Sequence, residues 1–145
     1  MAKRPRGVPK KHLEIRSEDL SGDSGPVALS ARPPKEDVYY LLTLSIGITG
    51  EQGADLFYVR IATPEGLQAK APETATIMAS RAMIVISDFD WRLIQTYLKE
   101  ILKVCVAPTW AEATERLQRY FQWEYENMQD AERARIIAQT STEES

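Results

Sequence analysis

The sequence predicts an α+β fold: a small, mainly antiparallel sheet of about four strands with two C-terminal helices packed on one of its faces. Three observations lead to this prediction. The strand-like segments precede the helical ones along the chain. Residues 42–48 alternate between large apolar and small or polar side chains, as a strand with one buried face does. Residues 91–105 repeat apolar side chains at helical spacing, as a helix lying on a sheet does.

The N-terminal region divides into a tail, a short strand and a loop. Residues 1–11 hold five basic residues, two prolines and no acidic residue, so we expect a disordered basic tail. Residues 12–19 partly alternate, which predicts a short edge strand. Residues 21–35 are rich in Ser, Gly and Pro, a composition typical of a loop.

Three further strands complete the predicted sheet. Residues 38–49 form the best strand, and the glycine-containing turn at residues 50–53 leads to another strand over residues 56–63. Two strands around such a turn form a hairpin. The apolar run at residues 82–86 predicts a central strand. Residues 67–80 show little periodicity and contain a proline, so we expect either a short helix or only a loop there.

The first predicted helix begins near residue 90 and ends before Pro108. Asp88 or Asp90 can cap its first turn, because a carboxylate accepts the free amides there. Six apolar residues then fall within about 100° of helical arc and predict a buried stripe. They are Trp91, Ile94, Leu98, Ile101, Leu102 and Cys105.

The second predicted helix opens on a capping box. The Thr109 hydroxyl accepts the amide of Glu112, whose carboxylate reaches back to the start of the helix. We expect this helix to run from Trp110 to about Met128, or as far as Ile137. Its apolar stripe consists of Trp110, Ala113, Leu117, Tyr120, Phe121 and Met128.

Length and composition indicate one domain without disulfides. The chain has 145 residues, 43% hydrophobic and 27% charged, so we expect a single domain over residues 12–138 and a polar tail over residues 139–145. The lone Cys105 cannot form an internal disulfide and favours a reducing compartment. No apolar run reaches the ~20 residues of a membrane span. One His and one Cys are too few for a zinc site, and the P-loop spacing is missing, so we expect no metal and no cofactor.

Charge is distributed unevenly along the chain. With five of the 18 basic residues in the tail, 13 basic and 21 acidic residues remain from His12 onward, a net charge of −8. An acidic body repels phosphates and disfavours direct nucleic-acid binding, whereas it suits a basic protein partner. The basic tail could touch nucleic acid or anionic lipid. A solubilising terminus explains it better, because no aromatic residues are interleaved with the charges.

Four features could carry chemistry, and each has a simpler structural interpretation. The three glycines within residues 47–53 could cradle a phosphate, but a hairpin turn explains them better because no helix start follows. Asp88 and Asp90 could bind a cation or act as an acid/base pair, although helix capping is the commoner role. Cys105 could be a nucleophile, yet on an apolar stripe it behaves as a small hydrophobic residue. We expect His12 to be an exposed strand residue rather than a ligand.

Residues 123–126 (WEYE) are the most informative stretch. If the helix continues through them, Trp123 falls near the polar face, where an exposed Trp among acids is a plausible interface anchor. Coverage by the C-terminal extension is the alternative. Glu124 falls inside the apolar arc, where a carboxylate must be hydrogen-bonded or paired, with Trp110, Tyr40 or a backbone amide as the donor. The predicted partner-binding residues are Glu112, Glu115, Arg119, Trp123, Glu126 and Asp130. The predicted structural residues are Asp90, Trp91, Thr109, Trp110, Leu117 and Glu124.

Several short motifs in a fixed order resemble one protein family. The most specific are residues 109–110 (TW) and 123–126 (WEYE). Taken over roughly residues 12–128, the motifs resemble the immunity protein 8 family of bacterial polymorphic and contact-dependent toxin systems. The chain departs from the family pattern after Pro64, where a Trp-Leu pair is expected. The other matching motifs are residues 44–47 (LSIG), 53–57 (GADLF), 59–64 (VRIATP), 83–86 (MIVI), 88–91 (DFDW) and 117–120 (LQRY).

The resemblance implies a cytoplasmic binding protein rather than an enzyme. Such a protein binds the toxic domain of a cognate effector and neutralises it in a stoichiometric complex, and we expect a monomer or weak dimer that holds no cofactor. A basic nuclease is the toxin class that would suit the acidic body. Two other classes stay open: a small enzyme that uses the carboxylates of Asp88, Asp90 or Glu124, and an adaptor subunit that self-associates through its helix pair.

Overall fold

The computed structural model describes residues 10–29, 37–74, 82–126, 132 and 135–137. Within these residues, strands and helices follow one another as the sequence predicts, with two additional short strands. The elements are β1 (Leu13–Gly22), β2 (Gly25–Val27), β3 (Tyr39–Ile48), β4 (Asp55–Ala62), α1 (Pro64–Thr74), β5 (Met83–Val85), α2 (Trp91–Cys105), α3 (Trp110–Leu117) and β6 (Gln122–Trp123).

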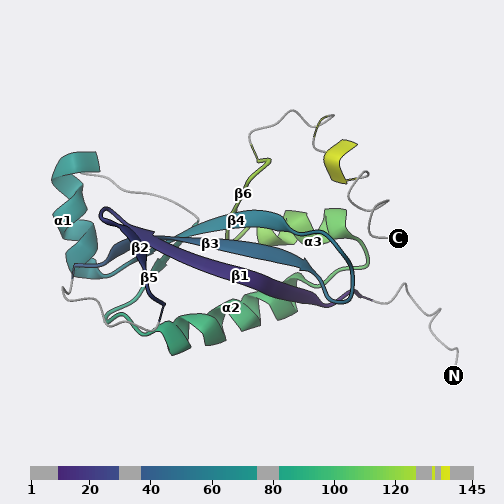
Figure 1. Ribbon diagram of the computed structural model, residues 1–145, viewed down its shortest axis with the longest axis horizontal. Coiled ribbons are helices and arrows are strands. Elements are labelled where there is room, and N and C mark those ends of the chain that lie inside the picture. The colour runs from purple at the N-terminus through teal and green to yellow at the C-terminus, as the bar shows by residue number, and fades with distance from the viewer. Residues whose placement is uncertain (1–9, 30–36, 75–81, 127–131, 133–134, 138–145) are drawn as a thin grey trace, which may run out of the picture.

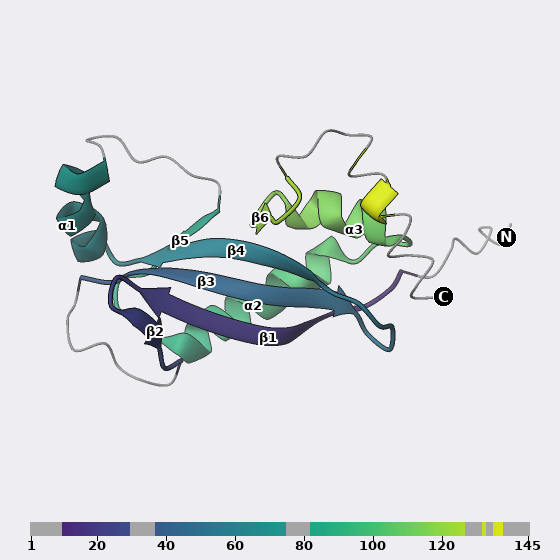
Figure 2. The same cartoon turned by 45° about the horizontal axis from the view of Figure 1, so that its top comes forward.

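The described strands form one sheet in the order β2-β1-β3-β4-β5, with β6 also paired to β4 (Figure 1). All pairs are antiparallel except β4 with β5. In the view of Figure 2 the sheet lies in front and α2 runs behind it, with α3 on the same side. The predicted α+β class, with a mainly antiparallel sheet and two helices after it, is confirmed. The prediction of a central strand at residues 82–86 is wrong, because β5 is the last strand of this order.

The core lies between one face of this sheet and the helices α2 and α3. In β3 the predicted alternation is confirmed, since the even-numbered apolar residues from Leu42 to Ile48 are buried while Thr43 and Ser45 are partly exposed. The odd-numbered residues of β4, such as Phe57 and Val59, are buried on the same side. Burial of this apolar face supplies the main driving force for folding.

The first strand is longer than the sequence predicts. Instead of ending at residue 19, β1 continues to Gly22 and turns back at once into β2, inside the predicted loop at residues 21–35. The two strands pair from Leu20 with Val27 to Gly22 with Gly25. Gly25 has a φ of 109°, a conformation that glycine adopts without steric cost, which permits this tight turn.

A β-bulge interrupts β1 at Arg16. Ile15 pairs with Ile46 and Ser17 pairs with Ser45, so Arg16 is the extra residue in the ladder. An extra residue shifts the two-residue period of the strand by one. The core side of β1 therefore changes from odd-numbered to even-numbered residues, and Leu20 is buried at 3% exposure.

The region around residues 67–80, for which the sequence allowed either a short helix or a loop, contains helix α1. The helix begins at Pro64, earlier than residue 67, and the described part of the chain breaks off after Thr74. The Thr63 hydroxyl accepts hydrogen bonds from the amides of Gly66 (3.1 Å) and Val38 (3.0 Å). A Cβ at residue 66 would lie only 1.8 Å from the carbonyl oxygen of Val38, so only glycine lets this turn pack against the chain that enters β3.

Helix α2 follows the sequence prediction closely. Asp90 is its N-cap, and its carboxylate accepts hydrogen bonds from the amides of Arg92 and Leu93. Trp91, the first residue of the predicted stripe, is partly buried. The other stripe residues, all buried, are Ile94, Leu98, Ile101, Leu102 and Cys105.

Helix α3 starts as predicted but is much shorter. Thr109 caps it by accepting the amide of Glu112 (3.2 Å), and Trp110 and Leu117 are buried. The prediction that this helix continues to about Met128 is wrong, because it ends at Leu117, whose carbonyl accepts the amides of Tyr120 and Phe121 in a turn. Residues 132 and 135–137 are helical again.

The ends of the predicted domain are only partly described. Lys11, which the sequence assigns to the tail, donates its amide to the carbonyl of Ala107 (3.0 Å) and its ammonium to Glu51 (3.0 Å). Residues 1–9 of the predicted tail and all of residues 139–145 lie outside the described residues.

Candidate protein-binding surface

Trp123 is buried, which contradicts the prediction of an exposed anchor. It is 1% exposed, because the chain leaves α3 at Leu117 and residues 122–123 pair with β4 as β6, so that Trp123 lies opposite Phe57. Phe121, the residue before β6, is buried as well. Along a helix the two side chains would have diverged by about 200°.

A buried carboxylate holds two indole rings. Asp55, at the start of β4, is 5% exposed, and its Oδ2 atom accepts hydrogen bonds from Nε1 of Trp123 (3.0 Å) and Nε1 of Trp110 (3.2 Å). We call these three residues the indole–carboxylate joint. It connects the sheet, α3 and β6, and it satisfies both indole donors, which would be costly to bury without an acceptor.

Burial raises the pKa of Asp55, the two indole hydrogen bonds oppose that effect, and the charge of Glu124 adds to it. Asp55 was not among the predicted site residues. The sequence prediction missed it because it placed Trp123 near a polar helix face, where an indole donor needs no buried acceptor. One signal, the alternation of aromatic residues 121, 123 and 125 with polar residues, indicated a strand where a helix was predicted.

Glu124 is exposed, not buried in an apolar arc as predicted. Its carboxylate accepts the amide of Leu56 (3.0 Å), and its own amide donates to the carbonyl of Leu56 (3.1 Å). A backbone amide was one of the three donors expected for it. The carboxylate therefore completes the ladder between β4 and the end of β6 instead of pairing inside the core.

Part of the predicted acidic surface is exposed on α3. Glu112, Glu115 and Arg119 are exposed, and the two acids lie one turn apart on the same helix face. Glu126 is partly buried, and Asp130 lies outside the described residues. The structure thus presents two neighbouring carboxylates on α3 as a candidate contact for a basic surface.

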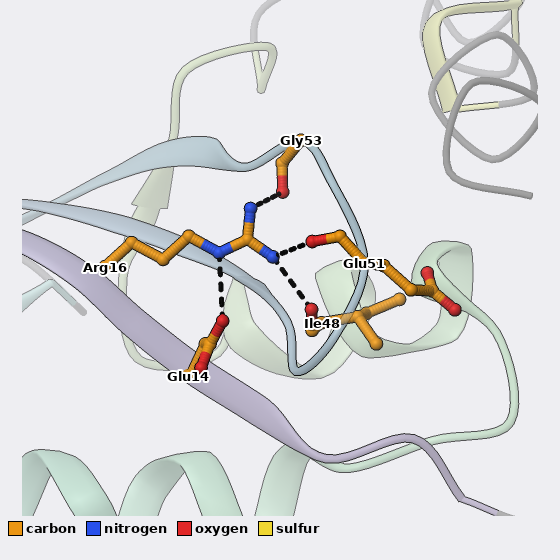
Figure 3. Close-up of polar contacts among 5 residues, drawn as sticks. All are labelled: Glu14, Arg16, Ile48, Glu51 and Gly53. Carbon is orange, nitrogen blue, oxygen red and sulfur yellow. Dashed lines mark hydrogen bonds and ion pairs between the residues drawn. The ribbon is translucent and has the colours of Figure 1, made fainter.

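The glycine loop between β3 and β4 binds an arginine of its own chain. The Arg16 guanidinium donates to the backbone carbonyls of Ile48, Glu51 and Gly53, and its Nε donates to the Glu14 carboxylate (Figure 3). A phosphate cradle needs amides that point inward, whereas here carbonyl oxygens converge on a cation. The hairpin interpretation of residues 47–53 therefore agrees with the geometry.

Gly47 makes room for this arginine. A Cβ there would lie 2.7 Å from the guanidinium carbon of Arg16 and 2.6 Å from the carbonyl oxygen of Gly53. The bulge at Arg16, the glycine of β3 and the turn therefore form one structural unit at this end of the sheet.

The other residues considered for chemistry have structural roles, are exposed, or are weakly reactive. Asp90 caps α2, and Asp88 and His12 are exposed. Burial raises the pKa of the Cys105 thiol to about 11, so the thiol is protonated and weakly nucleophilic near neutral pH. Among the described residues, no three His, Cys, Asp or Glu side chains gather as a metal site.

In the part of the chain that the structure describes, no helix has both the length and the apolar character needed to span a bilayer.

A second apolar stripe on α2 faces solvent, and the sequence prediction did not single it out. Leu93, Tyr97 and Val104 are 57%, 48% and 61% exposed, and they fall within about 40° of helical arc, next to the buried stripe. Val85 of β5 is also exposed, at 55%. Leu93 and Tyr97 of α2, together with β5, border a hollow of about 390 Å³.

A larger groove, of about 470 Å³, lies between β1 and α2. It contains Glu18, whose pKa is raised by burial, while a hydrogen bond from Gln95 and the charge of Lys99 act in the opposite direction. Gln95 and Lys99 of α2 already interact with this carboxylate, so the acidic group in the groove has partners within the chain.

Comparison with known proteins gives one match. The family model described as Immunity protein 8 matches residues 13–128, which confirms the resemblance noted from short motifs. No curated protein and no solved structure matches the chain.

Proposed function

Since the chain belongs to the immunity protein 8 family, we propose that it binds the toxic domain of a cognate bacterial effector and neutralises it in a 1:1 complex. The family match over residues 13–128 carries this proposal. The exposed acids of α3, Glu112 and Glu115, agree with it because they offer a surface for a basic partner. Arg119, exposed in the turn that follows α3, belongs to the proposed contact surface.

We propose a neutralising role without catalysis. Two of the three carboxylates that an enzyme would use have other partners, since Asp90 binds the amides at the start of α2 and Glu124 binds the amide of Leu56. The net charge of −8 from His12 onward argues for a protein partner, such as a basic nuclease, over direct binding of nucleic acid. We also propose a cytoplasmic location, where a protein with one unpaired cysteine remains reduced.

The test of this proposal uses the C-terminal domain of the cognate effector, which is to be sought in the gene next to the one that encodes this chain. Bacteria that express this domain should stop growing, and co-expression of the chain should restore growth. Purified together, the two proteins should elute as a 1:1 complex in size-exclusion chromatography with light scattering. Failure to protect the cells and failure to form a complex would together contradict the proposed function.

A kinetic measurement tests the acidic surface of α3. If the toxin domain is basic, the double charge reversal Glu112→Lys with Glu115→Lys should slow association roughly tenfold at low salt, because long-range attraction sets the encounter rate. Raising the salt concentration should shrink the difference by screening. Glu65→Lys is the control, since Glu65 is exposed on α1 at the far end of the sheet (Figure 1). Equal association rates in all three proteins would move the contact away from α3.

A further inference from the structure

Strand β5 has one unpaired edge in the described part of the chain. It is the last strand of the sheet order, and it pairs with β4 through the bonds from the Arg60 amide to Ala82 and from the Ile86 amide to Ala62, both 2.9 Å. Backbone groups alternate between the two sides of a parallel strand. The N–H and C=O groups of Met83 and Val85 therefore point away from β4, and such an edge is a template for another strand.

The unpaired edge borders the hollow between β5 and α2. Val85, Leu93 and Tyr97 are each about half exposed around it. An extended chain laid beside β5 could hydrogen-bond the free edge and place alternate side chains in the hollow. All seven lining residues are apolar or aromatic: Met83, Ile84, Val85, Ile86, Leu93, Ile94 and Tyr97.

The charge around the hollow favours one kind of occupant. Asp88 and Asp90 are exposed at the end where β5 leads into α2. From His12 onward the chain carries a net charge of −8, so a second copy in this place would bring two acidic bodies together. A segment with apolar side chains and flanking basic residues would complement the site instead.

This edge continues toward the proposed contact on α3. β3 occupies one side of β4 along its whole length, so β5 and β6 share the other side, at residues 60–62 and 57–58 of β4. Figure 2 shows both short strands along this side, with α3 next to β6. The hollow and the helix that carries the acids therefore both border this side of β4.

We propose that an extended, apolar and basic segment of the toxin domain adds to the sheet as a strand beside β5 and fills the hollow between β5 and α2. This proposal rests on the proposed function and assigns its main contact. The backbone of Met83 and Val85 would bind the segment, while Leu93 and Tyr97 would receive its side chains. Asp88 and Asp90 would meet its basic residues.

The side-chain part of the proposal is tested with Leu93→Asp, and Val104→Asp is the matched control. Both residues are exposed apolar residues of α2, but Val104 does not line the hollow. With the C-terminal effector domain as the probe, Leu93→Asp should raise the Kd at least tenfold, whereas Val104→Asp should change it less than about twofold. Equal losses would overturn the assignment, since the added charge alone would then explain them.

The backbone part is tested at Val85. The Val85 amide points away from β4, so Val85→Pro removes the outward donor without breaking the existing ladder, a position where an edge strand tolerates proline. Val85→Pro should weaken binding at least tenfold, while Val85→Ala, which retains the amide, should weaken it less than about threefold. Far-UV circular dichroism and Tm verify that each variant is folded. If a folded Val85→Pro variant binds as well as Val85→Ala, strand addition is wrong.

The outcomes separate this proposal from the proposed function. If the wild-type chain neither protects cells nor binds the effector domain, the proposed function fails. If the wild-type chain binds while Leu93→Asp and Val85→Pro bind equally well, the function stands and the β5 site is overturned.

Discussion

The indole–carboxylate joint and the hollow beside β5 lie along the same side of β4, yet they differ in how far their aromatic side chains are buried. Trp123 at the joint is 1% exposed, whereas Tyr97 at the hollow is 48% exposed. At the joint, Asp55 accepts both indole N–H groups, so the rings are buried with their donors satisfied. At the hollow, no described strand covers β5. An aromatic residue therefore marks a binding surface only where the fold leaves it uncovered.

We expect the indole–carboxylate joint to contribute strongly to the stability of the fold. Trp123→Ala should lower the free energy of unfolding by about 3–5 kcal/mol, the usual cost of removing a buried Trp. Urea denaturation measures this loss. Gln122→Ala is the control, because Gln122 is the exposed neighbour in the same strand, and it should cost less than about 0.5 kcal/mol. A similarly small loss for Trp123→Ala would remove the contrast between the two regions.

The carboxylate of the joint should matter through its acceptor atoms. Asp55→Ala leaves two buried indole donors without their acceptor, and it should destabilise the fold by about 1–3 kcal/mol more than Asp55→Asn, which retains a carbonyl oxygen. Chemical denaturation of the two variants at one pH gives the difference. If Asn is as damaging as Ala, the hydrogen bonds to the indoles contribute little.

Asp55 should also make the stability of the fold depend on pH in a definite direction. Because burial raises the pKa of Asp55, the folded state holds this proton more tightly than the unfolded state does. The stabilisation from protonation is complete below the unfolded pKa of about 3.9 and disappears as the pH rises through the folded pKa. The stability of the wild-type chain relative to Asp55→Asn should therefore increase when the pH is lowered from 7 toward 4. A constant difference over this range would mean that Asp55 titrates normally.

Glu124 should show a smaller effect, because it lies at the exposed rim of the joint. Glu124→Gln retains an acceptor for the Leu56 amide, whereas Glu124→Leu loses it. The Leu variant should cost about 0.5–1.5 kcal/mol more than the Gln variant, the net value of one hydrogen bond. Thermal unfolding of both variants tests the difference, and equal Tm values would show that the carboxylate has no structural role.

The smallest change in stability is expected at the hollow. Leu93→Ala removes a side chain that is 57% exposed, so the free energy of unfolding should change by less than about 0.5 kcal/mol. The same urea titrations measure it beside Trp123→Ala. A loss above 2 kcal/mol would show that Leu93 belongs to the core and would remove the reason for regarding the hollow as a free surface.

Much of the fold was predictable from short segments of sequence. The alternation in β3, the buried stripe of α2 and the caps at Asp90 and Thr109 each depend on residues a few positions apart. Their local geometry is the same in any fold that buries the apolar face. The family resemblance, which rests on motif order, was likewise available before the structure.

The candidate surface was less predictable, because long-range pairing decided it. Trp123 and Asp55 are 68 positions apart, and only their meeting at β4 ends the helix early and buries the indole. The bulge at Arg16 likewise depends on carbonyls of the turn after Ile48. The sequence alone determined which face of β3 and of α2 is apolar and where α2 and α3 begin. The tertiary structure decided which apolar residues stay exposed, since that depends on which distant strand covers each edge of the sheet.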